Sequence, residues 1–328
     1  MSPIRFSRRT AMMAATASLS APALLTAVSS SALAQAPAAA GQAPGFYRYK
    51  LGDITLTAIN DGFFRRPLEG FVRNAELPAV QEAMRAAFLP TDAVPIPFTT
   101  LVVQSGSRVI LLDTANGDNG APTSGTWMAN FRAAGFDPAQ VTDIVISHFH
   151  GDHIGGIRAK AGSLNFPNAT IQVPTPEWAF WMSDERMNAA PDPMKGAFMN
   201  VRRVFAPIAA NVKQFTPGAE VAPGVLSFAA HGHSPGHCVF GVQSGTQRMM
   251  FMADVTNHPA LFVKNPDWSA VFDQDADAAR AVRRRMLDMA ASERALVAFY
   301  HAPFPATGYI AKDGNGFNFV PVQWSTGA

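Results

Sequence analysis

Residues 148–153 read His-Phe-His-Gly-Asp-His and lie between the apolar stretch Val145-Ile146 and the turn Gly155-Gly156. A His-x-His-x-Asp-His pattern arises by chance in roughly two of ten thousand chains of this composition, so it indicates a specific site. Two histidines one residue apart on an extended segment project to the same side and can hold one divalent ion. Asp152 and His153 lie just past the bend, and their offset suits a second ion.

Three more predicted strands end in ligand-type side chains. Residues 231–237, His-Gly-His-Ser-Pro-Gly-His, follow the predicted strand 225–229, Asp254 follows the strand 249–252, and His301 follows the strand 295–300. Because α/β sheets build their sites where strands end, we expect these side chains to meet the first cluster. Their nitrogen and oxygen atoms suit zinc, with cobalt, manganese or iron as substitutes.

The composition is that of a folded protein with a large core. The chain has 328 residues, of which 48% are hydrophobic and 15% are charged. These values exclude intrinsic disorder, collagen and a coiled coil. Cys238 is the single cysteine, so the chain forms no internal disulfide.

Residues 1–34 have the pattern of a signal peptide. Arg5, Arg8 and Arg9 precede a stretch rich in Ala, Ser and Leu, which ends at the small-x-small sequence 32–34. The Arg8-Arg9 pair favours the twin-arginine route, with Sec export as the alternative. Serines and a proline within the stretch make a membrane anchor the weaker interpretation. We therefore expect cleavage near Ala34 and a periplasmic or secreted protein.

Removal of this segment leaves 23 basic residues against 24 acidic ones and no basic run. We therefore expect no nucleic-acid partner. Residues 35–45 have the composition of a flexible tail. Residues 46–328 are expected to form one catalytic domain without a membrane anchor, and the candidate assembly is a homodimer.

Strand and helix patterns alternate along this domain, which predicts a single α/β fold. One predicted hairpin spans 47–59 and ends at the turn Asn60-Asp61-Gly62, and a second spans 99–113. The other predicted strands are 141–147, 170–173, 225–229, 238–242, 249–252 and 295–300, and the predicted helices are 76–89, 126–134 and 275–291. Residues 183–212 read as a helical insertion placed over a site.

In order and spacing, the two histidine clusters, Asp254 and His301 resemble the metallo-β-lactamase superfamily over nearly the whole mature chain. The segments SHFHGDHIGG (147–156), FAAHGHSPGH (228–237) and FNFVPVQWS (317–325) are similar to the exported methyl parathion hydrolases and their lactonase or arylesterase relatives. The resemblance implies an αββα sandwich with a dinuclear metal centre between its sheets.

The resemblance also implies which side chains bind each ion. The implied ligands are His148, His150 and His233 for the first ion, Asp152, His153 and His301 for the second, and Asp254 as a bridge between the two. A bridging hydroxide would then attack the substrate, with Asp152 orienting it. Asp152 and Asp254 are thus the expected catalytic carboxylates.

His237 and Asp113 are expected to support the ligands through hydrogen bonds rather than bind metal themselves. Asp113 resembles the family's structural aspartate, which bonds a metal-ligand loop. Cys238 does not fall at the position of Asp254, where several true β-lactamases place a metal thiolate. This difference disfavours antibiotic hydrolysis.

Trp181 and Phe198 are expected to line the substrate pocket. By resemblance, organophosphate specialists carry phenylalanines at the positions of Gly120 and Ala197, which argues here against a specialised triesterase. The neighbours Arg65-Arg66 either recognise a carboxylate or form a solvated pair beside a turn.

These residues favour a hydrolase with two divalent ions, most simply Zn²⁺, that cleaves a lactone or an aryl ester, with phosphotriesters as a side activity. The expected substrate is small, neutral and apolar or aryl. The alternatives are an organophosphate triester hydrolase, a mononuclear iron dioxygenase and a non-catalytic zinc-binding protein. The second set of ligands argues against the iron enzyme.

Overall fold

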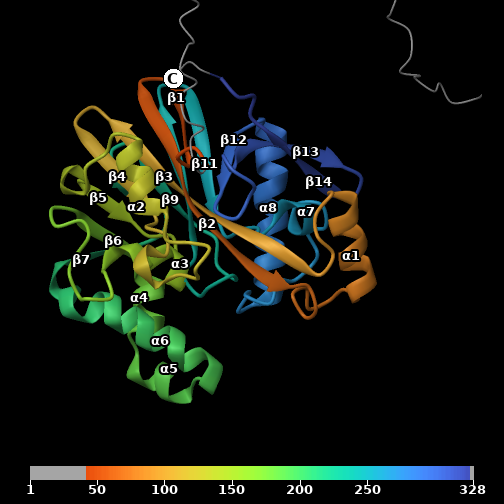
Figure 1. Cartoon of the computed structure of the whole chain (residues 1–328), viewed down its shortest axis with the longest axis horizontal. Helices are drawn as coiled ribbons and strands as arrows, with labels where there is room; N and C mark the ends of the chain where they lie inside the picture. The colour runs from red at the N-terminus through yellow and green to blue at the C-terminus, as the bar shows by residue number, and fades with distance from the viewer. Residues whose placement is uncertain (1–41, 326–328) are drawn as a thin grey trace, which may run out of the picture. The chain divides into compact units, whose positions relative to one another are not determined.

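The computed structural model describes residues 42–325, so the predicted signal peptide and most of the predicted tail lie outside the described residues. Two mixed sheets, each of seven strands, form the centre of this part of the chain (Figure 1). The first sheet has the order β1 (Phe46–Leu51), β2 (Ile54–Pro67), β3 (Ala93–Ser105), β4 (Arg108–Leu112), β5 (Asp143–Val145), β6 (Thr170–Pro174) and β7 (Val212–Phe215). The second has the order β14 (Gly316–Pro321), β13 (Thr307–Asp313), β12 (Leu296–Phe299), β11 (Gln247–Ala253), β10 (Cys238–Ser244), β9 (Val225–Ala229) and β8 (Glu220–Ala222).

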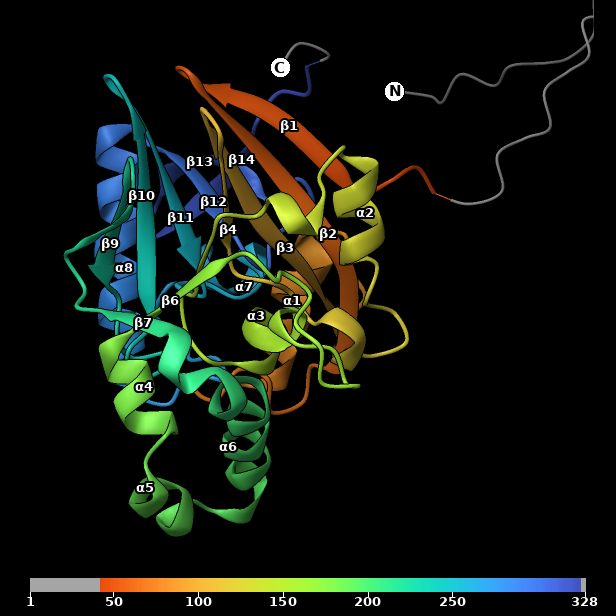
Figure 2. The same cartoon turned by 90° about the vertical axis from the view of Figure 1, so that its left-hand side faces the viewer.

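Helices cover the outer faces of both sheets. The helices are α1 (Leu77–Ala86), α2 (Trp127–Ala133), α3 (Gly151–Ile154), α4 (Thr175–Trp181), α5 (Asp184–Ala189), α6 (Asp192–Phe205), α7 (Pro259–Phe262) and α8 (Ala276–Glu293). Helices α2 and α6 pack on the first sheet and α8 packs on the second. Helices α4, α5 and α6 lie together at one end of the sandwich (Figures 1 and 2). The predicted αββα architecture is confirmed, and α5 and α6 form the predicted insertion.

The central strands are apolar on both faces because both faces are buried. Along β11, Met249 and Phe251 point into the core between the sheets, whereas Met250 and Met252 point toward α8. Strand β4 alternates in the same way, since its Leu111 faces the helices of the first sheet. Side chains of a strand project to alternate faces, so a continuous apolar run is typical of a strand covered on both sides.

Both sheets differ in part from the prediction. The predicted turn Asn60-Asp61-Gly62 is wrong, because β2 continues to Pro67 through a bulge between Asn60 and Phe63. Asp61 explains the bulge: its carboxylate is buried and accepts hydrogen bonds from the backbone of Asn116, Gly125 and Trp127. Strands β7, β8, β13 and β14 lie outside the predicted strands; β7 extends the first sheet, and the other three extend the second.

Within residues 42–325, no helix combines the length and the apolar character that crossing a bilayer requires.

Replacing a fully buried residue of a central strand should lower the free energy of unfolding far more than replacing a partly exposed one. Leu111 is fully buried, so we expect Leu111→Ala to lower the free energy of unfolding by about 2–5 kcal/mol. Leu226, on β9, is 38% exposed and serves as the matched control, for which we expect a loss below about 1 kcal/mol. Urea unfolding at fixed metal content measures both, and equal losses would contradict this packing.

Candidate metal centre

The candidate metal ligands lie where four strands of the two sheets end. His148 and His150 follow β5, and Asp152 and His153 lie on the short helix α3 that comes next. His233 follows β9, while Asp254 and His301 come directly after β11 and the end of β12. The fold therefore brings residues far apart in the sequence to one edge of the sandwich.

The seven predicted ligands form two groups. The first group is His148, His150, His233 and Asp254, and the second is Asp152, His153 and His301. In each group, one ligand atom from every side chain lies within 4.8 Å of the others. Two groups of this composition, with nitrogen and carboxylate donors, fit two divalent metal ions.

Fixed hydrogen bonds orient three of the imidazoles. The Nδ1 atoms of His153, His233 and His301 lie 2.8–3.0 Å from Asp113 Oδ2, Asp273 Oδ1 and the Pro97 carbonyl oxygen. Carboxylate and carbonyl oxygens only accept hydrogen bonds, so each Nδ1 donates. In the neutral form, which binds metals, each Nε2 would keep its lone pair, and all three Nε2 atoms face Asp254, at 3.1–3.2 Å from its oxygens.

Two buried polar atoms without hydrogen-bond partners indicate that the site suits a metal ion. Among the described residues, His153 Nε2 and Asp254 Oδ1 are buried 3.2 Å apart and neither has a hydrogen-bond partner. Burial alone would lower the pKa of His153, but the carboxylates of Asp254, Asp152 and Asp113 raise it well above its usual value. The centre therefore attracts a cation, and a divalent ion satisfies its unpartnered atoms.

Two histidines of the first group, His148 and His150, are neutral. Burial would lower the pKa of His233, but Asp254 and Asp273 raise it to about 9. Burial, together with the neighbouring His233, lowers the pKa of His150 to about 3, and burial lowers the pKa of His148 well below its usual range. The Nδ1 atom of His150 lies 3.0 Å from His148 Nε2 and 2.9 Å from His233 Nε2. Neutral imidazoles are the form that binds metals.

Asp254 contacts both groups. Its Oδ1 faces His153 of the second group, and its Oδ2 lies 3.2 Å from His233 of the first. Both carboxylates line the cavity at the centre, but the side chain of Asp152 is 22% exposed, compared with 4% for Asp254. Asp152 is therefore the more accessible carboxylate for a water molecule or a substrate.

His237 and Asp113 hold ligand backbones and rings in place. His237 donates from Nδ1 to the Ala230 carbonyl at 2.9 Å, and its Nε2 accepts from the Asp254 backbone N–H at 3.1 Å. Both ring nitrogens of His237 are thus occupied. Asp113 accepts hydrogen bonds from the Ser147 backbone and hydroxyl and from His153.

Two more buried carboxylates support the centre, and the sequence analysis does not find them. Glu177 accepts hydrogen bonds from the Phe149 and Gly236 N–H groups and from the Ser234 hydroxyl, which ties the two histidine loops together. Asp273 pairs with His233 and with the fully buried Arg283 of α8. Neither carboxylate belongs to a histidine motif, so only the fold reveals them.

The cavity at the centre has a volume of about 440 Å³. Besides ligands, its walls are Phe64, Arg66, Ile96, Phe98, Asn116, Asn119, Asn200, Asn257 and Phe272. Asn200 comes from α6, so the insertion contributes to this wall.

The predicted pocket residues need correction. Trp181 and Phe198 are buried beneath the wall, where Trp181 donates to Glu177 and packs on Phe198, because both side chains complete the core under α4 and α6. Ala197 packs against that core, and Gly120 does not line the cavity. A Cβ atom at Gly120 would lie 2.1 Å from Ser124 Oγ and 2.8 Å from Asn116 Cβ, so a larger residue here would displace both side chains.

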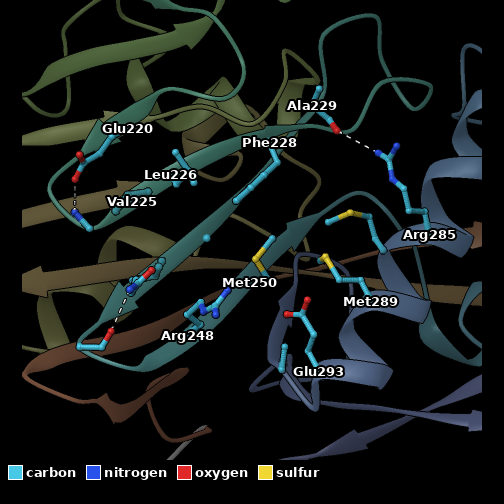
Figure 3. Close-up of a pocket in the computed structure, with 17 residues that line it drawn as sticks. Glu220, Val225, Leu226, Phe228, Ala229, Arg248, Met250, Arg285, Met289 and Glu293 are labelled. Atoms are coloured by element: carbon cyan, nitrogen blue, oxygen red, sulfur yellow. Dashed lines mark hydrogen bonds between the residues drawn. The ribbon is translucent and has the colours of Figure 1, made fainter.

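A larger groove of about 890 Å³ lies between the outer face of β9–β11 and α8 (Figure 3). Phe228, Met250 and Met289 line it, with Arg285 near one end, where its guanidinium approaches the Ala229 carbonyl. Among the described residues, no histidine lines this groove, whereas the candidate metal ligands His150, Asp152, His233, Asp254 and His301 line the smaller cavity.

A protein family and several solved structures share this fold. The family model described as Metallo-beta-lactamase superfamily matches residues 95–301. The chain is similar to AidC, described as a dizinc quorum-quenching lactonase in complex with a product, with 26% identity, a TM-score of 0.81, and coverage of 86% of this chain and 99% of that one. It is also similar to the hydrolase AbOPH of the beta lactamase superfamily, with 25% identity, a TM-score of 0.83, and coverage of 87% and 100%.

A probable metal-dependent hydrolase from Staphylococcus aureus shares the fold, with 19% identity, a TM-score of 0.71, and coverage of 84% of this chain and 99% of that one. No curated protein matches the chain.

Two ligand groups should bind about two metal ions per chain. We expect elemental analysis of zinc-loaded protein to give this ratio, and removal of the metal by a chelator to lower the unfolding temperature, because the ligands converge only in the folded state. A single bound ion, together with unchanged binding after His301→Ala, would contradict the assignment of the second group.

Asp254 and His237 should differ in their effects on metal binding. Asp254→Ala removes a carboxylate that contacts both groups, so we expect loss of both ions and of turnover. His237→Ala leaves every candidate ligand in place and removes the hydrogen bonds to the Ala230 carbonyl and the Asp254 backbone, so it should weaken metal binding or activity by about 10- to 100-fold. Metal titration of both variants measures the difference. A larger loss in His237→Ala would overturn the ligand assignment.

Proposed function

We propose that this chain, which belongs to the metallo-beta-lactamase superfamily and is a metal-dependent hydrolase, uses two zinc ions to cleave a lactone or an aryl ester. The observation that carries the proposal is the position of Asp254 between the two ligand groups, beside a cavity with aromatic walls. The likeness to AidC, a dizinc lactonase, supports both the metal and the bond type.

Two zinc ions would supply a water of lowered pKa and a Lewis acid for the ester carbonyl. The residues of the chain would supply the rest. His148, His150 and His233 would hold one ion, Asp152, His153 and His301 the other, and Asp254 both. Burial would raise the pKa of Asp152, but His153 and His301 lower it to about 2, so this carboxylate is ionised and can accept a proton from the attacking water.

The cavity walls support a substrate with an apolar or aryl part. Phe64, Phe98 and Phe272 face the same space as the candidate metal ligands. Aromatic side chains of this kind pack against rings and acyl chains at little cost in conformational entropy. Phosphotriesters are proposed as a side activity, because the same pair of ions can polarise a phosphoryl oxygen.

A panel of lactones, aryl esters and phosphotriesters tests the proposal. We expect zinc-loaded protein to hydrolyse a lactone or aryl ester with the highest kcat/KM. Phe272→Ala should reduce that value by about 10-fold, as the loss of one aromatic wall implies. Leu226→Ala, outside the cavity, is the control. A higher kcat/KM for a phosphotriester would overturn the ranking, and turnover of none of the substrates would overturn the hydrolase mechanism.

A further inference from the structure

Arg65 and Arg66 are neighbours in β2 but have different surroundings. The Nη2 atom of Arg65 lies 3.6 Å from Asp92 Oδ2, and both side chains are largely exposed. Arg66 is half-buried and lines the cavity of the metal centre. Among residues 42–325, its guanidinium forms no hydrogen bond and no ion pair. Arg65 is therefore paired with a carboxylate, whereas the N–H groups of Arg66 are free to bind a ligand.

Phe272 holds the Arg66 guanidinium on the cavity wall. The Cζ atom lies 5.0 Å from the centroid of the Phe272 ring, and both side chains line the same cavity. A guanidinium stacked on an aromatic face keeps its N–H groups free at its edge, where they can bind a carboxylate through two parallel hydrogen bonds. This contact orients the cation without neutralising it.

The cavity has no other anion to balance Arg66. Asp152 and Asp254 are its only acidic lining residues among those described, and both face the histidines of the centre. Two divalent ions would more than neutralise these two carboxylates. The cavity would then carry an excess of positive charge, which favours an anionic ligand.

Two asparagine amides add hydrogen-bond donors to the walls. The Oδ1 atom of Asn200 accepts from Arg203 at 3.1 and 3.2 Å, and the Oδ1 atom of Asn257 accepts from the His258 backbone at 3.0 Å. Asn257 is 5% exposed, and its Nδ2 is buried without a hydrogen-bond partner. With their oxygens engaged, both amides can offer N–H groups to a ligand that is rich in acceptors.

We propose that the substrate carries a carboxylate, in addition to its scissile ester bond, and that this carboxylate pairs with Arg66. The proposal rests on the proposed ester hydrolysis and narrows its substrates to half-esters of dicarboxylic acids and lactones with a carboxylate side group. In the reaction, the hydroxyl of water joins the acyl carbon, the ester C–O bond breaks, and the proton goes to the departing oxygen. The product of a half-ester is then a dicarboxylate. This substrate class replaces the expectation of a neutral substrate.

Two p-nitrophenyl esters of similar length test the role of Arg66. We expect the wild-type enzyme to hydrolyse the glutarate half-ester with a higher kcat/KM than the neutral pentanoate ester. Arg66→Met should lower the ratio of these two values by about 10- to 100-fold, as the loss of a charge-assisted pair implies. Arg66→Lys should give an intermediate ratio, and Arg65→Met, the matched control, should leave the ratio unchanged. Unfolding temperatures of all variants show whether they fold.

Two further measurements distinguish a failure of the proposed ester hydrolysis from a failure of the proposed role of Arg66. Added salt should raise KM for the half-ester alone, because only that substrate is attracted by charge. Calorimetric titration of zinc-loaded protein with glutarate should show weaker binding to Arg66→Met than to the wild type. If neither ester is hydrolysed but glutarate binding depends on Arg66, the ester chemistry fails while the anion site stands. An unchanged kcat/KM ratio, or equal glutarate binding by both proteins, overturns the role of Arg66.

Discussion

Seven candidate metal ligands converge at one edge of two sheets, and in each of their two groups the ligand atoms lie within 4.8 Å of one another. Three imidazole nitrogens approach the two oxygens of Asp254, with their outer nitrogens already engaged by fixed acceptors. Such an arrangement is unfavourable unless a cation lies among the acceptors, because these atoms are buried and their partial negative charges repel one another. The fold and the metal centre are therefore coupled: folding gathers the ligands, and bound ions stabilise the folded state.

Buried carboxylates behind the ligands make this convergence possible. Glu177 joins the loop of His150 to the loop of His233, and Asp273 connects His233 to Arg283 on α8. Each carboxylate accepts hydrogen bonds or ion pairs from several donors, which offset part of the cost of its burial. Since these donors come from different elements, the ligand positions depend on the whole sandwich rather than on a single loop.

The ligands could be predicted from the sequence because their signal is local: His148, His150 and His153 lie within six residues, directly after an apolar strand. The α/β class could be predicted because most strands and helices carry clear periodicity, whereas the αββα sandwich is implied by the resemblance of the histidine motifs to the superfamily. The cavity wall could not, since Trp181 and Phe272 are both aromatic in sequence, and only packing decides that the first is core and the second is wall. Glu177 and Asp273 escaped prediction because isolated acids are ordinarily exposed.

Strand alternation explains how β2 shapes the cavity. Phe64 and Arg66 lie two residues apart and face the cavity, as do Ile96 and Phe98 on the paired strand β3, where Phe64 is the direct partner of Ile96. Side chains of a strand alternate between faces, so Arg65 necessarily points away, toward Asp92. The bulge anchored by Asp61 determines which side chains of β2 face the cavity. A shift of the strand by one residue would turn Arg65 toward the cavity and Arg66 away from it. The charge of the cavity wall thus depends on a hydrogen-bonded aspartate that lies outside the cavity.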